Sequence, residues 1–129
     1  MVCGEARARE KTMTTSRIEA LMKERKGHRL ALASARAEAA LAALEYAGIS
    51  AWVVGSLARR TFGFHSDVDF LVDCSPGGKH AAFRIIEAEM KDFPFHFTAS
   101  ADLDETTRNA MMEEAADASS IRPYAHPAG

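Results

Sequence analysis

The feature of this 129-residue sequence that most restricts its fold is a short run, Asp67 to Asp73, in which the side chains alternate in character. Val68, Phe70 and Val72 fall on one face of an extended strand, and the residues between them fall on the other. Because an apolar strand face must be buried by a second layer, this run predicts a sheet packed against helices.

The rest of the chain supplies helices and strands in alternation. Apolar residues recur at helical spacing from Ser16 to Ala47, with Ser16 and Glu19 as a capping box, Gly27 as a point where the helix can split, and Gly48 as its end. Helices are also expected over 56–61, 79–91 and 104–118, with Asp104 capping the last, and strands over 49–54 and 93–98. Three strands covered by helices predict an α/β or α+β domain with one core.

The expected domain covers residues 15–118. Residues 1–14 are expected to be a disordered N-terminal extension. Residues 119–129 contain Pro123, Pro127 and a terminal glycine, with too little apolar content to fold alone, and are expected to be a flexible tail. We expect neither a signal peptide nor a membrane-spanning segment.

Composition excludes several classes of protein. Sixteen Lys and Arg against eighteen Asp and Glu give a net charge of −2, which argues against binding nucleic acid or anionic membrane with the whole surface. Cys3 and Cys74 match no metal or disulfide spacing, so we expect a reduced, cytoplasmic protein.

The expected strand over 49–54 runs directly into Gly55 and Ser56. A helix that starts at such a turn presents free backbone N–H groups, which suit a phosphate. Gly55 allows close approach, and the Ser56 hydroxyl can donate to a phosphate oxygen. The alternative is that Ser56 only caps the helix.

Asp67 and Asp69 point the same way from their strand, about 6.6 Å apart. Two carboxylates this close repel each other, and a cation between them removes the repulsion. Oxygen ligands favour Mg²⁺ or Mn²⁺, which proteins often bind together with substrate phosphates. The alternative is an exposed polar face, although the packed opposite face indicates that this one is directed at something.

Together these motifs resemble the minimal nucleotidyltransferase branch of the DNA polymerase β superfamily, whose signature is Gly-Ser, a gap of ten residues and Asp-x-Asp. Ten residues separate Ser56 from Asp67 here, and the resemblance covers residues 16–118. Its supporting residues are Ala58 and Arg59 in the gap, Ser66 before the first aspartate, and Phe70-Leu71-Val72 after the second.

The resemblance implies a small mixed sheet flanked by helices, ATP or another NTP as substrate, and transfer of a nucleotidyl group with Mg²⁺ or Mn²⁺. Asp67 and Asp69 would be the catalytic metal ligands. The nucleotide-binding residues would be Gly55, Ser56, Arg59 and Ser66.

The sequence departs from the family at two positions. The third carboxylate expected on the next strand is replaced by His96, which is either a base or merely a polar strand residue. The glycine usual after Ala-Arg is Arg60, which either contacts phosphate or faces solvent.

Three functions are compatible with these residues. The first is an enzyme that transfers AMP or another NMP to a protein or RNA acceptor, as the antitoxin of a toxin–antitoxin pair with a separate toxin-like partner. The second is an inactive module of the same fold that acts by binding a partner, and the third is a small-molecule resistance enzyme. The sequence also contains a basic cluster, which either contacts RNA or a partner or is a solvated helix face. Its residues are Lys23, Arg25, Lys26, His28 and Arg29. The sequence does not indicate an oligomeric state.

Overall fold

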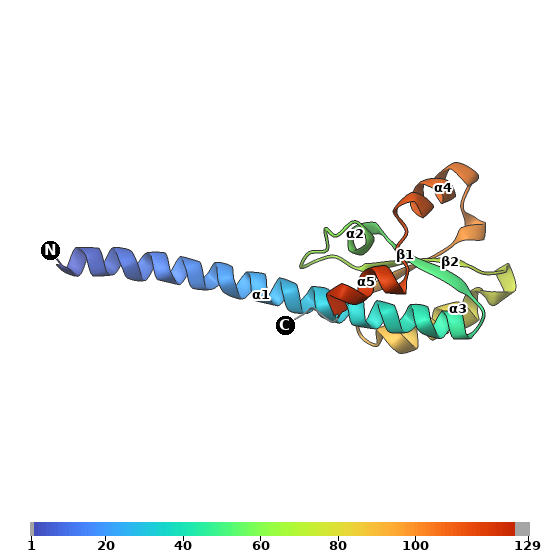
Figure 1. Cartoon of the computed structure of the whole chain (residues 1–129), viewed down its shortest axis with the longest axis horizontal. Helices are drawn as coiled ribbons and strands as arrows, with labels where there is room; N and C mark the ends of the chain where they lie inside the picture. The colour runs from blue at the N-terminus through green and yellow to red at the C-terminus, as the bar shows by residue number, and fades with distance from the viewer. Residues whose placement is uncertain (1, 126–129) are drawn as a thin grey trace.

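A computed structural model describes residues 2–125, with side chains from residue 17 onward (Figure 1). It confirms the expected α+β class, a three-stranded mixed sheet flanked by helices. Its elements are α1 (Val2–Tyr46), β1 (Ser50–Val54), α2 (Gly55–Ala58), β2 (Val68–Asp73), α3 (Lys79–Met90), β3 (Phe95–Ala99), α4 (Glu105–Glu114) and α5 (Ala118–Ala125), with 3₁₀ turns at Pro76–Gly78 and Ser100–Asp102.

The sheet has the order β1-β2-β3, with β1 antiparallel and β3 parallel to β2. The C-terminal end of β1 therefore lies at the same end of the sheet as the N-terminal ends of β2 and β3. In this register Val54 lies opposite Asp69, and Asp69 lies opposite His96. The strand pairing thus gathers residues from three separate parts of the sequence at one end of the sheet.

One face of the sheet is the core. Val68, Phe70 and Val72 are fully buried there, as their alternation predicted. The helices α1 and α3 cover this face side by side (Figure 1). They contribute many of the other apolar residues of the same cluster, among them Ala37, Leu41, Leu44, Ile86 and Met90.

The first helix is longer than the sequence pattern predicted. α1 begins at Val2 and continues through Ser16 and Gly27, so neither the capping box nor the split is present. Residues 2–14, expected to be disordered, are helical, and this stretch is rich in the helix formers Ala, Arg, Glu and Lys. Met1 lies outside the described residues.

The predicted end of α1 is confirmed. Gly48 adopts a left-handed backbone with φ +79° and donates to the Glu45 carbonyl, while Ile49 donates to the Leu44 carbonyl. This pair of bonds is the Schellman arrangement that ends a helix at glycine. Although α1 is long, no helix within residues 2–125 combines the length and apolar character needed to cross a bilayer.

The C-terminal part also differs from expectation. α4 is capped by Asp104 as predicted but ends at Glu114, and Ala116 then forms a two-bond bridge with Val53 on the outer edge of β1. Residues 118–125 form α5 on α1, although the tail expected to be flexible begins at residue 119 (Figure 1). Ile121 is buried there, and this tertiary contact outweighs the local Pro signal. Residues 126–129 lie outside the described part.

Candidate functional site

Two carboxylates and an imidazole meet at one end of the sheet. Asp67 directly precedes β2, and Asp69 is the second residue of that strand. His96 Nε2 lies 3.0 Å from Asp67 Oδ2, and His96 is also the register neighbour of Asp69 on β3. The structure therefore brings together the three residues that the sequence assigned to catalysis.

Gly55 is required by both its backbone and its surroundings. Its φ of +75° lies in the left-handed region that favours glycine. A Cβ at this position would overlap Asp69 Oδ2. The Asp69 carboxylate thus lies directly against the backbone where α2 begins, so the Gly-Ser and Asp-x-Asp motifs form one site.

The surroundings of Asp69 disfavour the ionised form of its carboxyl group. Burial of this half-buried carboxyl is the largest cause that raises its pKa. The negative charges of Asp67 and Glu114 raise the pKa further, whereas His96 and Arg59 act in the opposite direction. A bound cation at this place would stabilise the ionised form of Asp69.

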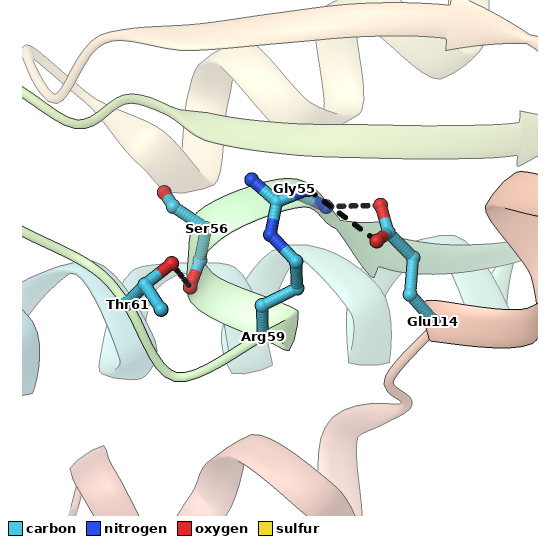
Figure 2. Close-up of polar contacts among 5 residues, drawn as sticks. All are labelled: Gly55, Ser56, Arg59, Thr61 and Glu114. Carbon is cyan, nitrogen blue, oxygen red and sulfur yellow. Dashed lines mark hydrogen bonds and ion pairs between the residues drawn. The ribbon is translucent and has the colours of Figure 1, made fainter.

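Sequence reasoning missed one residue of this site, Glu114 at the end of α4 (Figure 2). Its Oε1 accepts a hydrogen bond of 3.1 Å from the Gly55 N–H, and its Oε2 lies 3.4 Å from Arg59 Nη1. The bridge between Val53 and Ala116 holds the chain in place two residues later. Because this contact spans 59 positions, no local pattern in the sequence signals it.

The predicted nucleotide-binding residues have different partners. The N-cap of α2 is Val54 and Ser56 is the second residue of the helix, so Ser56 does not occupy the capping position that the alternative explanation gave it. Arg59 is more than half exposed and pairs with Glu114. The Ser66 hydroxyl accepts from the Gly63 N–H at 2.9 Å, which shapes the loop before β2.

Arg60 occupies the position where the resemblance places glycine. Its φ is +64°, in the left-handed region, and its guanidinium carbon lies 5.7 Å from the centroid of the Tyr124 ring on α5. The backbone here thus has the conformation that glycine adopts without strain. Arg60 is exposed, as the solvent-facing alternative predicted, and its guanidinium also lies beside an aromatic ring.

The donor set can be compared with the needs of Mg²⁺. Within residues 2–125, no three His, Cys, Asp or Glu side chains are grouped so that they alone could hold a metal ion. Mg²⁺ sites, however, often use only one or two carboxylates and complete their coordination with substrate phosphates and water. Asp67 and Asp69 fit a site of that kind.

Comparison with protein-family models, curated proteins and solved structures found no match to this chain. The functional interpretation therefore depends on the residues and geometry of the site itself.

Proposed function

We propose that this chain is a nucleotidyltransferase that uses Mg²⁺ or Mn²⁺ to transfer AMP, or another NMP, from an NTP to a hydroxyl of a protein or RNA acceptor. The observation that carries the proposal is the contact of the Asp69 carboxylate with the Gly55 backbone, with Asp67 and His96 alongside. A divalent cation held by the carboxylates would neutralise charge on the triphosphate and on the pyrophosphate leaving group.

The backbone and side chains of the turn provide the phosphate contacts. The first N–H groups of α2 have no partner within the helix, and Ser56 contributes a hydroxyl as the second residue of that helix. The Gly55 N–H already donates to Glu114, so a phosphate there would have to displace that carboxylate. Arg59, beside Glu114, supplies a positive charge at the same place.

His96 is suited to accept the proton of the attacking hydroxyl. When Asp67 is ionised it can only accept a hydrogen bond, so Nε2 of a neutral His96 carries the hydrogen and Nδ1 remains free as a base. The acceptor oxygen then bonds to the α-phosphorus, the bond to the bridging oxygen of pyrophosphate breaks, and the hydroxyl proton passes to Nδ1. Asp67 thus orients the base as well as binding the cation.

The alternative function is a module of the same fold, inactive or nearly so, that acts by binding a partner protein. Two observations favour it. The position of the expected third carboxylate is His96, whose side chain is 66% exposed, and Glu114 occupies the Gly55 N–H.

The deciding experiment measures pyrophosphate release with Mg²⁺ and ATP for the wild-type protein and for Asp67→Asn and Asp69→Asn. We expect both substitutions to abolish release without unfolding the protein. Asp73→Asn, a change in the same strand, is the matched control and should retain activity, because Asn can still accept from the Ser100 hydroxyl. A titration with Mn²⁺ and a non-hydrolysable triphosphate that gives no heat would contradict the proposal.

His96→Asp separates the two functions. It restores the expected third carboxylate and should increase turnover if the site is a transferase with a substituted base. If the protein acts only by docking, changing Asp67 and Asp69 leaves partner binding intact.

The proposed protein partner is a toxin-like chain encoded beside this one. Incubation with labelled ATP, Mg²⁺ and the product of the neighbouring gene tests this part. Label on that product supports the pair, and label on RNA alone contradicts it.

A further inference from the structure

A groove of about 550 Å³ lies at the same end of the sheet as Asp67, between α1 and the loops that precede β2 and β3. The proposed chemistry does not use it. One wall is a stripe of α1 that contains four basic residues, Arg25, His28, Arg29 and Arg36. The other wall contains the aromatic rings of Phe64 and Phe93.

Arg29 connects the groove to the catalytic end of the sheet. Its Nη2 donates to the Ser66 carbonyl at 2.8 Å, one residue before Asp67. Its guanidinium also lies 4.6 Å from the centroid of the Phe93 ring. These contacts fix α1 against the loop that leads into β2, so the groove and the carboxylates keep a constant spacing.

The groove combines the exposed guanidinium of Arg25 with an exposed aromatic ring, while Arg36 donates to the Met90 carbonyl at 3.0 Å. Arg25 and His28 are exposed, and Phe64 is 40% exposed. Asp92 is the only acidic residue among those that line it. Single-stranded nucleic acid is recognised by this combination, with cations beside the backbone and aromatic faces beneath the bases.

The distribution of charge along the chain agrees with a polyanion at this place. Residues 1–29 contain eight Lys and Arg and four Asp and Glu, whereas residues 30–129 contain eight and fourteen. The first segment therefore has a net charge of +4 and the rest −6. A strand of nucleic acid is attracted to α1 and repelled by most of the remaining surface.

We propose that this groove binds a single strand of nucleic acid, with a base stacked on Phe64 and phosphates beside Arg25, His28 and Arg36. The inference rests on the proposed function in one respect, namely that the bound strand is the RNA acceptor, one of the two proposed acceptor classes. Phe64 lines the groove, and Asp67 follows it three residues later in the same loop. A strand in the groove can continue round this loop towards Asp67.

The test measures fluorescence anisotropy of labelled oligouridylate and oligodeoxythymidylate of about 12 nucleotides with the full-length protein, without nucleotide or metal. We expect binding at about 50 mM salt that weakens towards about 200 mM. Arg25→Ala should lower the slope of log K against log salt by about 0.7, the value for one phosphate contact on a single strand. Phe64→Leu should weaken binding about tenfold through loss of stacking.

Matched controls separate the groove from general charge and apolar surface. Lys26→Ala removes a cation from the same helix outside the groove, and Phe83→Leu removes an exposed ring on α3. Each control should change the dissociation constant less than about twofold.

Absence of binding at low salt overturns the proposal, as does equal weakening by Arg25→Ala and Lys26→Ala with no effect of Phe64→Leu. Self-association through α1, detected by sedimentation and without oligonucleotide binding, also overturns it. Because the assay contains no ATP or Mg²⁺, strand binding without pyrophosphate release would refute the transferase but retain the groove. Pyrophosphate release without strand binding would retain the transferase and refute the groove.

Discussion

At the scale of single residues, the site is defined by a close approach between Gly55 and Asp69. The Asp69 carboxylate lies where the Cβ of any larger residue at position 55 would be, so only glycine at that position leaves room for it. The main reason for glycine in the Gly-Ser motif is therefore the space that the Asp69 carboxylate needs, and the free backbone N–H groups are a second reason.

Replacing Gly55 tests this close approach. Gly55→Ala should lower the free energy of unfolding by more than about 1 kcal/mol, because it adds left-handed strain to the displacement of Asp69. Gly27→Ala is the control, since nothing lies near that position inside α1, and it should raise stability by about 0.5–1 kcal/mol. Chemical denaturation measures both. Equal effects of the two substitutions would contradict the geometry.

Glu114 is the second residue-scale test. Its negative charge beside Gly55 should repel a triphosphate, while its oxygen satisfies the Gly55 N–H. Glu114→Gln keeps an acceptor and removes the charge, so we expect about three- to fivefold tighter binding of a Mn²⁺–triphosphate complex, measured by calorimetry. Glu113→Gln, on the same helix, should have little effect. Weaker binding of the Glu114 variant would instead make Glu114 a cation ligand.

At the scale of elements, the parts that the sequence predicted are those with local signals. The core face of β2 follows from alternation, the end of α1 from Gly48, and the start of α4 from Asp104. Two of the parts that it did not predict, α5 and Glu114, depend on distant contacts. Ile121 makes α5 a helix only by packing on α1, and Glu114 joins the site only because Ala116 pairs with Val53.

The cap of α4 gives a pH dependence. The Thr107 N–H donates to Asp104 Oδ1 at 2.7 Å, and this bond holds the pKa of Asp104 below its usual value. The cap therefore contributes fully above the unfolded-state pKa of about 3.9 and is lost as the pH falls through the lower folded value.

Accordingly, Asp104→Ala should lower the Tm by a constant amount between about pH 5 and 7, and by progressively less below about pH 4. Thermal scans across this range measure the difference. Asp104→Asn, which retains an acceptor without titrating in this range, is the control. A difference between wild type and the alanine variant that persists unchanged into strong acid would exclude the carboxylate as the cause.

At the scale of the whole molecule, the chain divides into a packed body and a projecting helix. Residues 17–28 are exposed throughout, whereas the same helix is buried against the sheet at Ala33, Ala37, Ala40 and Leu44 (Figure 1). Periodicity alone could not reveal this division, because Ile18, Leu21 and Met22 continue the apolar spacing into the exposed part.

Amide hydrogen exchange should show the division directly. Residues 17–28 are exposed, so we expect their amides to exchange at least about a thousandfold faster than those in the buried stretch 37–44. Uniform protection along α1 in dilute solution would mean that the projecting part is covered, and would count against a surface free for nucleic acid.

The bridge between Val53 and Ala116 has a consequence for how the protein behaves when concentrated. In an antiparallel strand, alternate residues direct both their N–H and C=O groups to the same side, so Ala51 and Val53 face away from β2. Ala116 occupies both groups of Val53, and only the peptide groups of Ala51 remain on that side of β1. A foreign strand therefore finds almost no template along this margin, and pairing between sheet edges would have to use β3, the strand at the other margin.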